Sequence, residues 1–223
     1  MPVREQDLAF LGKITASMTH ELNNVLGIIR ESAGLMEDFL AFGSQDSFPH
    51  REKFLKSIAG IQGQVRRGVE LITRLNRFAH SMDEPRGAVE VNELLEQTAF
   101  LMQRFARNRG VQLKVHPAAD GPAVATDPFH LQMVLAAMIE YFLERAEKGQ
   151  VVALIPRRQA QGVWIQVQPQ SEGAAPEGEA PLSREGPLPE KFAGLAEVLA
   201  DLEGRLFFPG ASPEEGLLLT LPA

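Results

Sequence analysis

The sequence predicts an α+β protein in which a two-helix hairpin precedes an α/β sandwich. Three observations lead to this prediction. Heptad-like apolar patterns fill the first third of the 223-residue chain, short alternating patterns fill the rest, and a segment with Pro85 and Gly87 separates the two. We expect a helical hairpin domain at residues 1–86 and a sandwich domain at residues 87–223.

Two helical patterns flank a break at residues 43–49, where Gly, Ser, Asp and Pro end one helix and allow the next to begin. Apolar residues recur every three or four positions in both patterns. The first stripe, which includes one serine, is Leu11, Ile14, Met18, Leu22, Val25, Ile28 or Ile29, Ser32, Leu35 or Met36, and Phe39. The second stripe is Ile58, Ile61, Val65, Val69, Ile72, Leu75, Ala79 and Met82. Two helices cannot enclose stripes of this length, so we expect a homodimer in which two hairpins form a four-helix bundle. The alternative is that the second half of the chain covers the stripes.

The second half follows a hinge expected at residues 83–90. Strands are expected at 89–91, 111–115, 123–125, 151–155, 163–167, 205–208 and 217–221. Helices are expected from the N-cap Asn92 to Gly110, from Pro128 to Lys148 and from 191 to 202. The strands at 151–155 and 163–167 form a hairpin in this interpretation, and the Pro-, Gly- and Glu-rich residues 169–190 are expected to be mobile. This mixture of elements indicates a two-layer sandwich.

Composition excludes several classes of function. The net charge of −7 disfavours binding to nucleic acid or to an anionic membrane surface. The absence of cysteine rules out disulfides, thiolate catalysis and iron–sulfur clusters. No apolar run approaches the roughly 20 residues that a membrane helix needs, and the N-terminus does not have the pattern of a signal peptide. We therefore expect a cytoplasmic location.

The remaining histidines and two aromatic residues are expected to be structural. The spacing of the histidines is not typical of metal ligands, so each is expected at the surface or in a structural role. These histidines are His50, His80, His116 and His130. Trp164 and Tyr141 are expected in the core.

His20 is the candidate for chemistry. At 100° per residue it lies about 200° from Met18 and about 160° from Leu22, so it points away from the apolar stripe. Asn24 lies one turn later on the same face, and Glu21 lies beside that face. An exposed neutral imidazole is a nucleophile near pH 7, a carboxylate can take the ring proton or fix its tautomer, and an amide can position water. On spacing alone the signal is weak, because a single exposed histidine on a helix is usually an ordinary surface residue.

The run His20-Glu21-Leu22-Asn23-Asn24 resembles the His-Glu-x-x-Asn pattern in the phospho-acceptor helix of bacterial sensor histidine kinases. The resemblance covers the whole chain. Residues 1–86 are similar to the dimerisation and histidine-phosphotransfer hairpin of that family, and residues 87–223 to its ATP-binding domain. It implies that His20 carries the phosphoryl group, that Glu21 assists proton removal, and that Asn24 places the water that hydrolyses a partner's phosphoryl-aspartate.

The sequence departs from the family at three nucleotide-binding motifs. Ala137 and Tyr141 stand where family asparagines hold Mg²⁺ and phosphates, and Pro169 stands where an aspartate reads the adenine. The glycine-rich phosphate motif has no counterpart between residues 186 and 196. Losing a charged hydrogen bond costs about 1.5–3 kcal/mol, and losing the Mg²⁺ ligand removes the main stabiliser of phosphoryl charge. We therefore expect no ATP binding and no intrinsic cofactor or metal; Glu140 or Glu144 is the alternative metal ligand.

These features favour a histidine phosphotransfer protein of a two-component phosphorelay. It would move phosphoryl groups between His20 and receiver-domain aspartates of response regulators, with Mg²⁺ supplied by the receiver. Residues 51–77 carry seven basic and two acidic side chains, which would steer an acidic receiver or form an ordinary solvated helix face.

Three other functions stay open. The closest is a response-regulator phosphatase that uses Asn24 and Glu21. The second is an ATP-dependent sensor histidine kinase with an atypical nucleotide site. The third is a dimeric non-catalytic regulator or scaffold in which His20 is a relic.

Overall fold

The computed structural model describes residues 4–41, 51–83, 86–160, 162–170, 190–208 and 216–222. Its contacts divide the chain into two compact units. The hairpin unit is Leu11–Arg77, and the sandwich unit comprises Met1–Phe10 and Phe78–Ala223. The first turns of the first helix and the end of the second therefore pack with the C-terminal half. The domain limits 1–86 and 87–223 stay a prediction.

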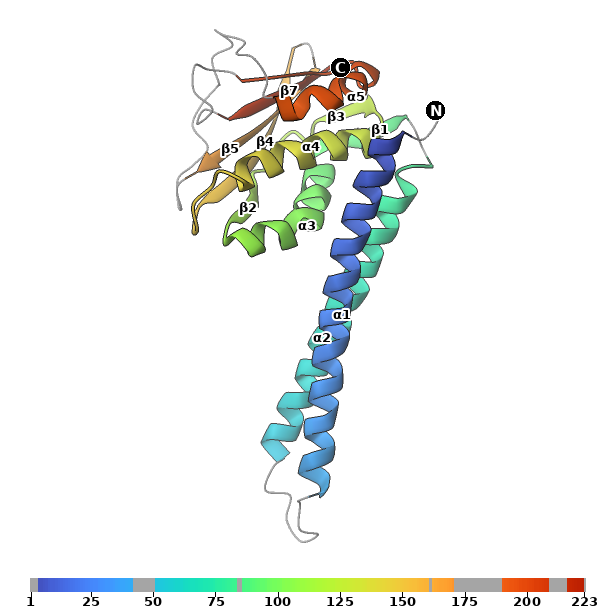
Figure 1. Ribbon diagram of the computed structural model, residues 1–223, viewed down its shortest axis with the longest axis vertical. Helices are drawn as coiled ribbons and strands as arrows, with labels where there is room; N and C mark the ends of the chain where they lie inside the picture. Colours follow the sequence, from blue (N-terminus) through green and yellow to red (C-terminus); the bar gives the residue numbers. More distant parts are fainter. Residues whose placement is uncertain are drawn as a thin grey trace. The chain divides into compact units, whose positions relative to one another are not determined.

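The hairpin unit contains most of two long helices, α1 (Glu5–Ala41) and α2 (Arg51–His80) (Figure 1). The predicted break at 43–49 lies outside the described residues. Ile14, Met18 and Val25 of the first predicted stripe are buried. A Cβ on Gly68 of α2 would lie 3.3 Å from Cγ1 of Val25, so the glycine lets the two helices approach closely there.

Part of the second predicted stripe is half-exposed. Val65, Val69 and Ile72 are 49%, 59% and 49% exposed, whereas the neighbouring Leu71 is buried. Because α2 carries apolar residues on two adjacent faces, periodicity alone does not tell which face packs inside the hairpin. Leu26 of α1 is also exposed, at 61%. The hairpin therefore keeps apolar surface that its own two helices do not cover.

The sandwich unit is built on a five-stranded sheet in the order β2-β4-β5-β7-β6. These strands are β2 (Gln112–Val115), β4 (Val151–Gln159), β5 (Gly162–Gln170), β7 (Leu217–Leu221) and β6 (Arg205–Phe207). β2 and β4 are parallel and the other pairs are antiparallel. A separate antiparallel pair joins β1 (Gly87–Glu90) to β3 (Ala123–Thr126). The helices are α3 (Val91–Arg109), α4 (Pro128–Leu143), the 3-10 helix η1 (Glu190–Leu195) and α5 (Ala196–Asp201).

This architecture confirms the α+β fold class and the β4–β5 hairpin (Figure 1). α3 and α4 contact each other and the sheet, and nearly all of α4 is buried, with Leu131, Leu135 and Ile139 fully enclosed. Trp164, expected in the core, is only half-buried on β5. Residues 169–170 belong to β5, and the rest of the segment expected to be mobile, 171–189, lies outside the described residues.

Two predicted helix ends were wrong. The N-cap of α3 is Glu90, whose carboxylate accepts hydrogen bonds from the backbone N–H groups of Asn92 and Glu93 at 3.2 and 2.6 Å. Asn92 instead exchanges two hydrogen bonds with the backbone of Ala118. A carboxylate two residues earlier thus reaches the free N–H groups first.

The second error concerns the end of α4, which lies at Leu143 rather than Lys148. The Arg145 guanidinium donates a hydrogen bond to the carbonyl of Tyr141 at 2.8 Å and so satisfies one of the last helical acceptors. Gly149 adopts a φ of 92° and donates its N–H to Gly110. Among the residues that the structure describes, no helix is long and apolar enough to cross a bilayer.

Candidate functional site

His20 is exposed on α1, as predicted from its position on the helix. Nδ2 of Asn24 lies 3.3 Å from Nδ1 of His20, so the two side chains meet on one face one turn apart. The sequence prediction that the amide lies within reach of the ring is thus confirmed.

This contact bears on the tautomer of the ring. An amide N–H donated to Nδ1 requires a lone pair there and puts the ring proton on Nε2. Turning the amide by 180° presents its oxygen, which accepts from an Nδ1–H and leaves the lone pair on Nε2. Of the two orientations, the one in which the amide oxygen accepts from Nδ1–H leaves the Nε2 lone pair free, as a nucleophilic imidazole requires.

Glu21 is buried between the helices rather than presented to solvent beside His20. Its side chain is 9% exposed, and Oε2 accepts a 2.9 Å hydrogen bond from the Arg67 guanidinium of α2. Ser17 lies one turn earlier on the same face. Its hydroxyl is buried and has no hydrogen-bond partner among the described residues, and the same holds for Oε1 of Gln64 on α2. A polar layer therefore crosses the hairpin next to the exposed histidine, and Arg67 stabilises the buried carboxylate charge.

The basic residues of α2 divide into paired and exposed groups. Arg67 is bound to Glu21, and Arg74 pairs with Glu70 at 3.3 Å. Arg66 is exposed beside Arg67. The excess of positive charge on the helix surface is thus smaller than the sequence count suggests.

In the sandwich unit, Tyr141, which the resemblance aligns with a family asparagine, is 3% exposed. Its ring packs on Phe142, Phe192 and Phe208 at centroid distances of 5.2–5.8 Å, and the Arg145 guanidinium lies 3.7 Å from its centroid. Aromatic rings and the Arg145 guanidinium therefore surround Tyr141. The family resemblance implies oxygen ligands for Mg²⁺ and phosphate at this position instead. At this position the protein therefore presents an aromatic ring rather than an amide oxygen.

Glu144, one of the two carboxylates considered as a replacement ligand, is already engaged. Nζ of Lys191 donates a 3.0 Å hydrogen bond to it and thereby lowers the pKa of Glu144 below its ordinary value. The described part of the chain holds no group of three or more His, Cys, Asp or Glu side chains arranged for a metal ion.

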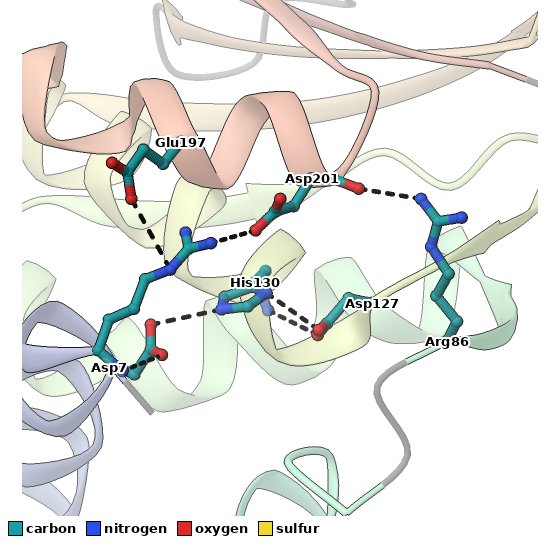
Figure 2. Close-up of polar contacts among 7 residues, drawn as sticks. Asp7, Arg86, Asp127, His130, Glu197 and Asp201 are labelled. Carbon is teal, nitrogen blue, oxygen red and sulfur yellow. Dashed lines mark hydrogen bonds and ion pairs between the residues drawn. The ribbon is translucent and has the colours of Figure 1, made fainter. Parts of the chain in front are cut away.

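His130, which was expected at the surface or in a structural role, has a structural one. It lies buried between Asp7, near the start of α1, and Asp127, the N-cap of α4 (Figure 2). The sequence gives a signal only for Asp127, which precedes Pro128 as an N-cap does. Asp7 is too far along the chain for any local pattern to reveal it.

Comparison with known proteins supports the resemblance drawn from the His20 motif. No family model matches the chain. The sensor protein FixL of Bradyrhizobium diazoefficiens is 28% identical over 145 residues, which are 64% of this chain and 28% of FixL. This chain thus matches little more than a quarter of the length of that relative.

Among solved structures, the catalytic domain of histidine kinase ThkA has a TM-score of 0.46 and 15% identity, and the match covers 61% of this chain and 95% of that one. Histidine kinase AdeS of Acinetobacter baumannii has a TM-score of 0.45 and 13% identity, over 91% of this chain and 97% of that one. The match to the sensor protein FixL agrees with the resemblance to sensor histidine kinases that the sequence predicts.

Proposed function

We propose that this chain is a histidine phosphotransfer protein of a two-component phosphorelay, which moves phosphoryl groups between His20 and receiver-domain aspartates without using ATP. The observation that carries the proposal is the exposed His20 imidazole with the Asn24 amide at 3.3 Å from Nδ1. A nucleophile that must meet another protein has to be exposed, and it has to keep a lone pair available.

In the transfer step, the receiver supplies both the phosphoryl group and the leaving group. A lone pair of the His20 ring attacks the phosphorus of the aspartyl phosphate, and the N–P bond forms as the P–O bond to the aspartate breaks. The aspartate carboxylate leaves with the electron pair, and the ring loses its N–H proton to water or to a carboxylate. The receiver contributes the divalent cation that neutralises the phosphoryl charge. The reverse step transfers the group to a second receiver.

Asn24 and Glu21 have different parts in this proposal. Asn24 fixes the ring tautomer, and its amide also suits the placing of a water molecule, which is the chemistry of a response-regulator phosphatase. Glu21 follows His20 in the chain, and Arg67 sets the position of its carboxylate. Because this carboxylate is bound to Arg67, bulk water shares the task of removing the proton.

Independence from ATP rests on the aromatic cluster around Tyr141. A magnesium nucleotide would need carboxylate or amide oxygens where this ring packs on Phe192 and Phe208. Displacing a buried aromatic ring costs about 3–5 kcal/mol, which is comparable to the binding free energy of a millimolar ligand.

The partners follow from the hairpin surface. We propose a homodimer in which Val65, Val69 and Ile72 pack against a second copy, because these half-exposed side chains follow a heptad spacing on one face. We also propose that the exposed Arg66 and its basic neighbours attract the acidic phosphorylation site of a receiver.

The experiment separates the open functions by the source of the label. A panel of receiver domains is charged on aspartate with radiolabelled acetyl phosphate and incubated with the full chain, and a parallel reaction contains radiolabelled ATP and Mg²⁺. The proposal expects acid-labile label on the chain from at least one receiver and none from ATP. Label from ATP supports a kinase instead, and label from neither source supports a scaffold.

Two variants assign the label to a residue. His20→Gln should abolish labelling because it removes the nucleophile. His80→Gln is the matched control, since His80 is another exposed helical histidine with a polar partner, Asp83, at 2.9 Å. Labelling of the His20→Gln protein at the wild-type level contradicts the proposal.

A further inference from the structure

A cluster of charged side chains fastens the start of α1 to α4 and α5 within the sandwich unit (Figure 2). Its members come from the residues before and within the first turn of α1, from the N-terminal end of α4 and from α5. We call them the α1 latch: Arg4, Asp7, Asp127, His130, Glu197 and Asp201. None of them belongs to the site around His20.

The His130 ring lies between two carboxylates. Its Nε2 is 3.3 Å from Oδ1 of Asp7, and its Nδ1 is 2.9 Å from Oδ2 of Asp127. The side chains of His130 and Asp7 are 7% and 6% exposed. The distances are those of ion pairs, although neither ring N–H points straight along its contact, since Nδ1 of His130 and Oδ1 of Asp7 form no well-aligned hydrogen bond.

The His130 contacts form one arm of the latch, and the contacts of Arg4 form a second arm. Its guanidinium forms an ion pair with Asp201 and lies 3.9 Å from Glu197, both on α5. Its backbone N–H donates a 2.9 Å hydrogen bond to Oδ2 of Asp7, which ties the two arms together. Arg86 approaches the same region but bonds to the carbonyl of Asp201 (Figure 2). Its guanidinium also bonds to the carboxylate of Glu203.

An aromatic cluster packs next to the latch. Phe10 of α1 lies 5.5 Å from Phe129 of α4 and 5.5 Å from Phe78, centroid to centroid. Phe129 lies 5.8 Å from the His130 ring. These contacts explain why the first turns of α1 pack with the sandwich unit.

The two carboxylates decide which form of the ring the latch needs. A neutral imidazole has one N–H and one lone pair, so it satisfies one carboxylate and turns a lone pair toward the other. Only the imidazolium donates from both nitrogens. The carboxylates of the latch also outnumber its cations, because Asp7, Asp127, Glu197 and Asp201 face Arg4 and the His130 ring, while the nearby Arg86 bonds to the carbonyl of Asp201 and to Glu203.

We propose that the α1 latch is controlled by one proton: the imidazolium of His130 fastens Asp7 and the first turns of α1 to α4, and loss of the ring proton releases this segment. α1 runs without interruption from Glu5 to Ala41, so the latch and His20 belong to the same helix. Release would therefore change the restraint on the start of the helix that carries the proposed phospho-acceptor.

The direction of the titration agrees with this geometry. The pKa of His130 is raised above its ordinary value of 6.5, mainly by the Asp127 carboxylate and also by Asp7. Burial of the ring acts in the opposite direction but is outweighed. The latch is therefore fully closed below that ordinary value, and it opens as the pH rises through the raised pKa of the folded protein.

Hydrogen–deuterium exchange of the full chain tests the latch directly. The amides of residues 4–10 are followed between about pH 5.5 and about pH 8.5, on both sides of the ordinary histidine pKa, with labelling times scaled for intrinsic base catalysis. Protection should fall as the pH rises, by up to about tenfold for each pKa unit by which folded His130 exceeds the released form. An NMR titration of the His130 ring in the wild-type protein should show the same midpoint.

His130→Gln should abolish this pH dependence, because glutamine does not titrate. The matched control is His116→Gln, which removes a half-buried histidine of the same unit that contacts Gln170 at 3.1 Å and should keep the wild-type behaviour. The proposal is overturned if the His130→Gln protein retains the wild-type pH dependence, or if the His130 ring titrates while protection of residues 4–10 stays constant.

Discussion

The amide nitrogen of Asn24 lies 3.3 Å from Nδ1 of His20, while the carboxylate of Glu21, the very next residue, is bound to Arg67 on the other helix of the hairpin. The group that contacts the exposed ring is thus the amide one turn away. The two contacts therefore have different consequences when they are lost. Loss of the Asn24 amide alters the tautomer preference of the His20 ring, whereas loss of the Arg67 guanidinium removes the ion pair of the buried Glu21 carboxylate.

Asn24→Ala should slow phosphoryl transfer to His20 about fivefold, since it removes one hydrogen bond worth about 1 kcal/mol in fixing the tautomer. The initial rate of labelling from a charged receiver domain measures this effect. The matched control is Asn23→Ala, an exposed neighbour on another face of α1 that should transfer at the wild-type rate. Equal rates for the Asn24→Ala and wild-type proteins would remove the role assigned to this amide.

Arg67→Gln should lower the free energy of unfolding by about 1–3 kcal/mol, because the buried Glu21 carboxylate would lose its ion pair with the guanidinium. The loss should lie at the lower end of that range, since Arg67 is 45% exposed and solvent screens the pair. Urea denaturation followed by circular dichroism measures the change. The control Arg66→Gln, at the exposed neighbour, should stay within about 0.5 kcal/mol of wild type.

Replacing both members of the pair distinguishes a true ion pair from two independent effects. The double variant Glu21→Gln, Arg67→Gln should lose less stability than the sum of the two single variants. Strict additivity of the single effects would contradict the stabilising role given to Arg67.

Val69→Glu should convert a dimer into a monomer, because it places a charge within the half-exposed stripe of α2. Light scattering coupled to size-exclusion chromatography measures the mass. The control Lys56→Glu also introduces a negative charge on α2. Lys56 is nine residues before Val65, so at 100° per residue it lies on the opposite side of the helix. The control protein should stay dimeric. A wild-type protein that is monomeric at all concentrations tested would refute the proposed homodimer.

The contribution of His130 to the free energy of unfolding should decrease as the pH rises. Because the folded-state pKa of His130 is raised, its contribution is present below the ordinary value of 6.5 and is lost as the pH rises through the folded-state pKa. At about pH 5.5, His130→Gln should cost about 1–3 kcal/mol, and the difference from wild type should shrink at about pH 8.5. Urea denaturation at the two pH values gives the comparison.

The exposed histidine His80 provides the control for that measurement. Its pair with Asp83 is open to solvent, with the side chains 79% and 71% exposed, so His80→Gln should leave the stability almost unchanged. A cost of His130→Gln that grows with pH would contradict the sign of the argument.

Much of the fold could be predicted because the patterns that define it are local. Heptad spacing predicted the two long helices, and alternating apolar residues predicted the strands of the β4–β5 hairpin and β7. The exposure of His20 also followed from helical geometry, since its angle from Met18 depends only on the residues between them. Asn24 was found by the same reasoning.

Features that depend on distant residues were not predictable in this way. The burial of Glu21 depends on Arg67 of the second helix, and the burial of His130 depends on Asp7, near the other end of the chain. The early end of α4 depends on Arg145, whose side chain both covers the Tyr141 ring and bonds its carbonyl. In each case a long-range or side-chain contact outweighs the local pattern.

The central claim is that His20 itself accepts a phosphoryl group from a receiver. The most direct measurement is to incubate the full chain with a phosphorylated receiver domain, without nucleotide, and to locate the added phosphate by fragmentation mass spectrometry under neutral conditions. The account predicts an acid-labile phosphate on the His20 imidazole, absent from the His20→Gln protein and present in the His80→Gln protein. Phosphate found on any other residue, or formed on His20 only when ATP is supplied, would contradict it.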